Sequence, residues 1–132
     1  MNALALRLSP GEDLKQALLN YCRGHSVDAA CILSGIGSLR RGMIRFANQP
    51  EGTLLEEKLE IISLAGTVSQ QGAHLHIAVS DQQGQVIGGH LMEGSLIYTT
   101  AEIMIGVIPY LIFKREFDPI TGCQELHIST HQ

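Results

Sequence analysis

The residues best suited to bind a ligand or support a reaction are three histidines in one predicted hairpin, His74, His76 and His90. Successive side chains of a strand point to opposite faces, so His74 and His76 share one face, while Leu75 and Ile77 occupy the natural core face. Imidazole is a common metal ligand and titrates near neutral pH. The pattern favours a metal or ligand site, and the alternative is a set of histidines merely exposed on a half-solvated sheet.

The position of His90 depends on the turn between the two strands. Residues 81–84, Asp-Gln-Gln-Gly, are typical of a type I turn closed by a left-handed glycine, which gives a three-residue loop. That loop places His90 opposite His76, where Cβ atoms are about 5 Å apart. A two- or four-residue loop would pair His90 with Leu75 and turn it to the wrong face. The pair Gly88-Gly89, which is typical of a bulge, leaves this alternative open.

Length and composition indicate one domain over residues 1–132. The chain has 132 residues, 45% of them hydrophobic, which suffices for one core but not for two. It contains no apolar run long enough to span a membrane, and its first residues lack the layout of a signal peptide. The widely spaced Cys22, Cys31 and Cys123 fit a reducing compartment, so we expect a cytoplasmic protein in which Cys22 and Cys31 are packing residues.

The charge balance argues against a chain that binds DNA strongly by itself. Nine basic residues face thirteen acidic ones and the net charge is −4, whereas nucleic-acid binding depends on Lys and Arg that neutralise phosphates. The basic pairs Arg40-Arg41 and Lys114-Arg115 are each predicted to lie in a solvated loop or strand edge. A local basic patch in an oligomer remains compatible with this composition.

Hydrophobic periodicity predicts one helix among many strands. At the helix start Ser9 caps, Pro10 takes the first position and Glu12 completes a capping box, and Gly24 can end the helix. Strands are predicted, besides the histidine hairpin, at residues 3–8, 29–33, 42–47, 54–68, 95–108, 110–117 and 124–128. This order predicts an α+β domain with an antiparallel sheet and one main flanking helix.

Glu102 is the candidate for a further role beside the histidines. It interrupts the apolar residues of the predicted strand 95–108, and a carboxylate in such a strand is costly to bury without a partner. It could orient a ligand histidine, as carboxylates around metal sites do. The alternative is an ion pair with Arg45 or another basic residue.

The remaining histidines and one glycine-rich segment receive structural interpretations. His25, His127 and His131 are expected to be surface or capping residues. Residues 34–38, Ser-Gly-Ile-Gly-Ser, resemble a phosphate-binding loop but lack its lysine and its helix. We expect this segment to let the chain turn tightly beside another backbone.

A series of short motifs runs through nearly the whole chain. It comprises Arg7 with Pro-Gly-Glu-Asp-Leu at 10–14, Ser-Gly-Ile-Gly-Ser at 34–38, Glu-Ile-Ile-Ser-Leu-Ala-Gly-Thr at 60–67, His-Leu-His at 74–76, Gly-Gly-His-Leu at 88–91 and Ala-Glu-Ile at 101–103. In this order the set resembles the plants-and-prokaryotes conserved domain, or PPC domain, of the type that stands alone in prokaryotes. Each motif is short, and the ordered set is what carries the resemblance.

The resemblance implies a fold, an assembly and a site. The fold is an antiparallel sheet with a flanking helix, the assembly is a homotrimer, and the site is a divalent metal, often zinc, on the residues that match His74, His76 and His90. In plants the domain accompanies AT-hook DNA-binding segments, and the DNA-binding description of prokaryotic members derives from those relatives. This chain contains no Arg-Gly-Arg core flanked by prolines, which weakens the DNA-binding inference.

Two functions are compatible with the three histidines. We favour a non-enzymatic trimeric module that binds a metal and a small ligand, with a DNA-binding or regulatory role suggested by the resemblance. The alternative is a metal-dependent enzyme, because three protein ligands with an open position are typical of catalytic zinc, which lowers the pKa of bound water to about 7. That enzyme would be a hydrolase or cupin-like, although the glutamate that cupins carry shortly after the histidine pair is missing.

Overall fold

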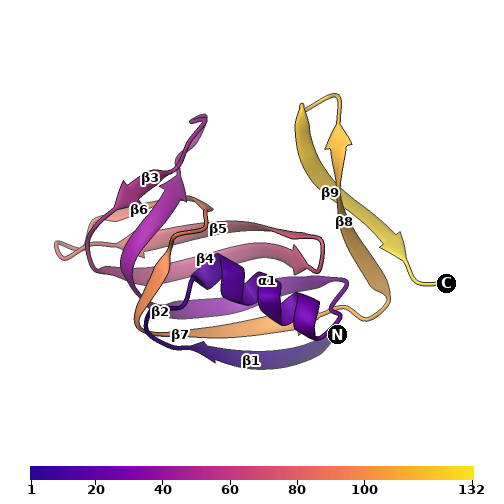
Figure 1. Cartoon of the computed structure of the whole chain (residues 1–132), viewed down its shortest axis with the longest axis horizontal. Coiled ribbons are helices and arrows are strands. Elements are labelled where there is room, and N and C mark those ends of the chain that lie inside the picture. Colours follow the sequence, from indigo (N-terminus) through magenta and orange to yellow (C-terminus); the bar gives the residue numbers. More distant parts are fainter.

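The computed structural model describes residues 1–132 and contains one helix and nine strands (Figure 1). In chain order the elements are β1 (Asn2–Leu8), α1 (Leu14–Gly24), β2 (Ala30–Arg45), β3 (Thr53–Leu55), β4 (Leu59–Ser69), β5 (Gly72–Ser80), β6 (Val86–Leu91), β7 (Leu96–Val107), β8 (Leu111–Asp118) and β9 (Cys123–Thr130). The main sheet has the order β1-β7-β2-β4-β5-β6, β3 pairs with β2, and β8 and β9 form a second, two-stranded sheet. All pairings are antiparallel, which confirms the predicted α+β class.

Strand β2 is longer than predicted and pairs with four other strands, β3, β4, β6 and β7. Its 16 residues pair with β7 and β4, and its end pairs with β6 through Ile44–Leu91 and Arg45–His90. The sequence predicted a tight turn at residues 34–38, which is wrong, because these residues lie inside the strand. The expected closeness to another backbone is confirmed, since a side chain at Gly37 would collide with the Thr100 carbonyl of β7.

The hydrophobic core lies between α1 and the inner face of the main sheet. It is a cluster of 21 buried residues, to which α1 contributes Leu14, Leu18, Leu19 and Cys22. Burial raises the pKa of the Cys22 thiol to about 11, as expected of a packing residue. The strand side chains obey strict alternation over the histidine strand, where Leu75 and Ile77 are buried and their neighbours are not.

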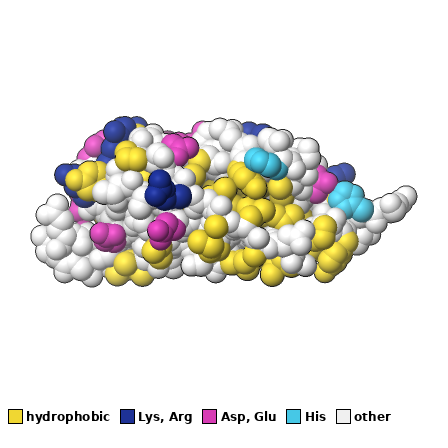
Figure 2. All heavy atoms as spheres, turned by 90° about the horizontal axis from the view of Figure 1, so that it is seen from below, with side chains coloured by type: hydrophobic (Ala, Val, Ile, Leu, Met, Phe, Trp, Pro, Cys, Tyr) yellow, Lys and Arg dark blue, Asp and Glu magenta, His cyan; other side chains and the backbone are white.

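The outer face of the sheet and its edge strand carry apolar surface. Leu33, Ile36, Ile62 and Met104 on β2, β4 and β7 point away from the core and are 39–53% exposed. Strand β1 is an edge strand, and Figure 2 shows hydrophobic side chains gathered on its side of the molecule. Helix α1 has neither the length nor the apolar surface to cross a membrane.

The helix begins later than the sequence predicted. Gly11 adopts a φ of 87°, a left-handed conformation that ends a turn instead of continuing a helix. The predicted partners do meet, because the Ser9 N–H donates to Glu12 Oε2 at 2.6 Å, but they close this preceding turn. The first helical residue is therefore Leu14, and the predicted capping box is wrong as the helix start.

Asp13 is the residue that caps α1. Its carboxylate accepts the Gln16 N–H at 3.0 Å and, through the other oxygen, the Gly94 N–H at 2.7 Å. One carboxylate therefore accepts a free N–H group of the first helical turn and also links the helix start to the segment that leads into β7.

The C-terminal hairpin β8–β9 stands apart from the main sheet and is anchored at its base (Figure 1). The Phe113 N–H donates to the Asp28 carbonyl at 2.8 Å, and Ser69 Oγ donates to the Phe113 carbonyl at 2.8 Å. The Phe113 side chain is buried. This anchor holds β8 beside the end of β4.

We expect Asp13→Ala to lower the free energy of unfolding by about 1–2 kcal/mol, since two N–H groups lose their acceptor. Urea denaturation measures this loss. Glu12→Ala is the matched control, because it removes only an exposed hydrogen bond in the preceding turn and should cost less than about 0.5 kcal/mol. Equal losses in the two variants would contradict the assignment of Asp13 as the cap.

Candidate metal centre

The β5–β6 hairpin brings His90 directly opposite His76, as the turn residues predicted. The Gly84 N–H donates to the Asp81 carbonyl at 3.0 Å, and Gly84 has a φ of 79°, the left-handed glycine of the expected loop. Pairing continues through Gly88-Gly89 without a shift, so the bulge alternative is wrong. The three histidines therefore project from the outer face, opposite the core.

The three imidazoles form one compact cluster. Each offers a ring nitrogen, and these nitrogens all lie within 4.8 Å of one another. The ring centroids of His74 and His90 are 5.1 Å apart in a stacked arrangement, and the His76 ring stands edge-on at 5.1 Å from His74 and 4.7 Å from His90. Zinc binds imidazole nitrogen at about 2.0–2.1 Å, so one ion between the rings is within reach of ligand atoms this close together.

The protonation state of the cluster suits metal binding. Partial burial lowers the pKa of His74 and of His90. Arg115 lowers the pKa of His74 further, and Arg45 does the same for His90, because a positive charge nearby opposes protonation. Neutral imidazole, the form with a free lone pair, is the form that ligates metals.

The other histidines of the chain differ from the cluster in having partners. His25 lies within 3.0 Å of a helix carbonyl, and His127 and His131 each approach a carboxylate, at 3.3 and 3.2 Å. All three are exposed, which confirms them as surface or capping residues. The clustered rings have no such hydrogen bond or ion pair within the chain, so their nitrogens are free for an ion, and the donor set fits zinc.

Glu102 is not brought to this cluster. It lies on β7 opposite Arg7 of β1, and strands β2 and β4 separate β7 from β5. The side chain is exposed, whereas its strand neighbours Ala101 and Ile103 are buried. The expectation of a costly buried carboxylate beside the histidines is therefore corrected: alternation along β7 turns Glu102 to solvent.

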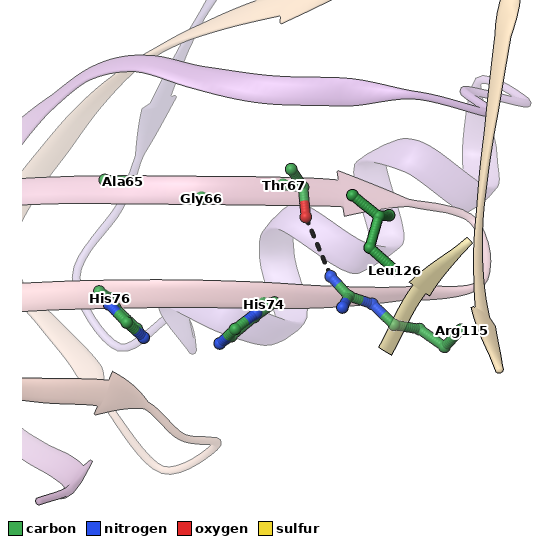
Figure 3. Close-up of a pocket in the computed structure, with 7 residues that line it drawn as sticks. All are labelled: Ala65, Gly66, Thr67, His74, His76, Arg115 and Leu126. Atoms are coloured by element: carbon green, nitrogen blue, oxygen red, sulfur yellow. Dashed lines mark hydrogen bonds between the residues drawn. The ribbon is translucent and has the colours of Figure 1, made fainter. Parts of the chain in front are cut away.

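Two adjoining cavities border the cluster, and His74 and Arg115 line both. The first has a volume of about 240 Å³, with walls formed by Ala65, Gly66, Thr67, His74, His76, Arg115 and Leu126 (Figure 3). The second, of about 460 Å³, extends past His90 to Arg45 and to Glu125 of β9. The C-terminal hairpin thus supplies one wall of the candidate site.

Arg115 is the site residue that the sequence analysis missed. The sequence predicts a solvated loop or strand edge for this basic pair. Both residues lie on β8 of a two-stranded sheet and Lys114 is exposed, but Arg115 is not fully solvated. The half-buried Arg115 donates from Nη2 to Thr67 Oγ1 at 2.9 Å (Figure 3). The alternation of β8, with Phe113 buried two residues earlier, is the local signal that would have turned Arg115 inward.

Comparison with known proteins assigns the family. Residues 1–109 match the model of the Plants and Prokaryotes Conserved domain, abbreviated PCC or PPC. The chain belongs to this family, and its fold is that of PPC domains.

Three similar proteins illustrate the range of relatives. A hypothetical protein from Salmonella enterica is 41% identical with a TM-score of 0.96, and the match covers 99% of this chain and 95% of that one. The metal-containing protein AF0104 from Archaeoglobus fulgidus is 30% identical with a TM-score of 0.78, over 96% and 94% of the two chains. The bifunctional protein GlmU of Synechococcus sp. strain JA-3-3Ab is 50% identical over 93% of this chain, which spans only 20% of that relative's length.

In the metal-free protein we expect stability to fall as the pH drops below about 6.5, the ordinary histidine pKa. The pKa of His74 and His90 is lower in the folded chain than in the unfolded one, so the unfolded chain binds more protons in this interval. Thermal unfolding in chelator, at a series of pH values, measures the slope.

The double variant His74→Gln with His90→Gln should show a shallower decline, whereas the surface variant His127→Gln should keep the full slope. If the double variant retained the slope of the parent, other groups would account for the acid sensitivity.

Proposed function

We propose that the protein is a metal-binding module in which His74, His76 and His90 hold a divalent ion, zinc being the ion that this donor set favours. The observation that carries the proposal is the convergence of three imidazoles, whose ring nitrogens lie within 4.8 Å of one another, on one face of the hairpin. The likeness to a metal-containing protein, at 30% identity over nearly the whole chain, supports it.

Three protein ligands leave one position of a tetrahedral ion for a further ligand. A bound zinc ion would supply a Lewis acid beside the cavity that His74, His76, Arg115 and Leu126 border. We propose binding and not hydrolysis, because Glu102, the candidate for a further role beside the histidines, lies on β7, away from the cluster.

Metal analysis of protein purified without an affinity tag tests this directly. We expect about one zinc per chain for the parent, and His76→Ala should weaken zinc affinity by at least about a hundredfold, since a direct ligand is lost. His127→Ala, which removes an exposed histidine from β9, is the matched control and should keep full occupancy. A parent protein that takes up no zinc at physiological concentrations would refute the proposed site.

We further propose that the module is a homotrimer, as the PPC resemblance implies. The apolar outer-face residues Leu33, Ile36, Ile62 and Met104 lie on neighbouring strands, and contiguous exposed apolar surface is typical of subunit contacts. The unpaired edge of β1 adjoins further hydrophobic surface (Figure 2). A second copy covering these surfaces would remove both from water.

Light scattering after size exclusion measures the assembly. The parent should have the mass of three chains, and Ile36→Asp should yield monomers, because it places a charge in the centre of the outer face. Ile120→Asp, at a 92% exposed position in the β8–β9 turn, is the control and should remain trimeric. A monomeric parent, or a trimeric Ile36→Asp variant, would contradict this interface.

We propose that any DNA-binding or regulatory role, which the resemblance implies, is carried by the trimer and not by the single chain. Each chain has a net charge of −4, so this role requires exposed cations such as Arg40 and Lys114 to gather on one face of the trimer, away from the acidic residues. We place the protein in the cytoplasm, where its three free cysteines remain reduced.

A further inference from the structure

The charges around the histidine cluster are mostly positive. Arg115 and Arg45 act on His74, and Arg45 and Lys15 act on His90, each lowering the histidine pKa, while Glu125 acts in the opposite sense on His74. A divalent ion held by neutral imidazoles would add to this excess. An anion in the adjoining cavity, which His74, His76 and Arg115 line, would balance it.

Arg115 is held in place to meet such an anion. Its guanidinium reaches from β8 toward Thr67 on the same side as His74 (Figure 3), and its Nη2 donates to Thr67 Oγ1 at 2.9 Å. The stem of the side chain passes the bare backbone of Gly72, where an added Cβ would lie 3.2 Å from Arg115 Cγ. Arginine carries five N–H donors and Thr67 takes one, so others remain for a ligand.

The remaining walls indicate what else the ligand carries. Ala65 and Leu126 supply apolar contacts beside the polar groups, and the volume of about 240 Å³ suits a small molecule. A planar guanidinium fixed beside a metal ion matches a carboxylate or phosphate group, whose oxygens can accept from the arginine while another oxygen meets the ion.

We propose that this cavity binds a small oxyanion, the carboxylate or phosphate group of a small molecule, and that Arg115 is the residue that recognises it beside the metal. This inference rests on the proposed metal site. It assigns Arg115, which lies beyond the residues that match the family model, a role in ligand choice and none in holding the ion.

Cobalt-loaded protein provides the test, because the visible spectrum of bound Co²⁺ reports a change in its ligands. Inorganic phosphate and acetate are titrated separately as probes, and at least one should perturb the cobalt bands in a saturable way. The probe with the tighter binding identifies the group that the site prefers.

Arg115→Gln should weaken the binding of that probe by at least about tenfold, since a charge-assisted hydrogen bond is lost. The same variant should bind cobalt at least as tightly as the parent, because it removes a positive charge near His74. Misfolding would weaken both affinities, so this split separates recognition from a structural role. Lys114→Gln is the matched control, with the same change in charge on an exposed neighbour, and should leave both affinities unchanged.

Thr67→Val keeps the charge but frees the guanidinium, and it should weaken the probe less than Arg115→Gln does. Cobalt binding with no effect of either anion, or an unchanged probe affinity in Arg115→Gln, would overturn the inference and leave the metal site standing. Failure of the parent to bind cobalt would overturn both.

Discussion

The register of the β5–β6 hairpin is the constraint on which the rest of the site depends. The Asp81 carboxylate accepts the N–H groups of Gln83 and Gln85, both at 2.9 Å, and so holds the loop at one length. A slip by one residue would turn His90 into the core and expose Leu91, which is now 2% exposed. Burying a leucine contributes about 1.5–3 kcal/mol, so core packing and site geometry select the same register.

The main sheet fixes the backbone positions of the three clustered histidines. Each histidine is a strand residue whose neighbours point inward, so Leu75, Ile77 and Leu91 fix the backbone from behind. Strand β2 reaches around to pair Arg45 with His90, which adds a further strand beside the site. Sites built on paired strands are held more precisely than sites on loops, and an ion that binds here meets ligands whose backbone is already placed.

Most of the fold and the core of the site could be predicted because their signals are local. Alternation placed His74 and His76 on one face, and the turn residues placed His90 opposite, without knowledge of any other strand. The same alternation, read along residues 101–105, would have placed Glu102 outside, but the apolar residues around it were interpreted as burial on both faces. The predicted helix start is wrong because the hydrogen bond between Ser9 and Glu12 forms equally well in a turn that precedes the helix.

The parts that could not be predicted depend on contacts between segments far apart in the chain. Nothing near Arg45 indicates that β2 runs on past its glycines to meet β6. Lys114 and Arg115 are adjacent basic residues, and alternation from Phe113 indicates which of them shares the face of the buried side chain. Only the anchoring of β8 against Asp28 and Ser69 brings that face to the histidines. The hydrogen bond between Thr67 on β4 and Arg115 on β8 joins residues 48 positions apart, so no local sequence pattern could have predicted it.

The two walls of the cavity come from different parts of the chain. The histidines come from the stretch that matches the family model, which ends at residue 109, while Arg115 and Leu126 come from the terminal hairpin. Substitutions in the β8–β9 hairpin would therefore change the side chains that line the cavity and leave the three imidazoles in place.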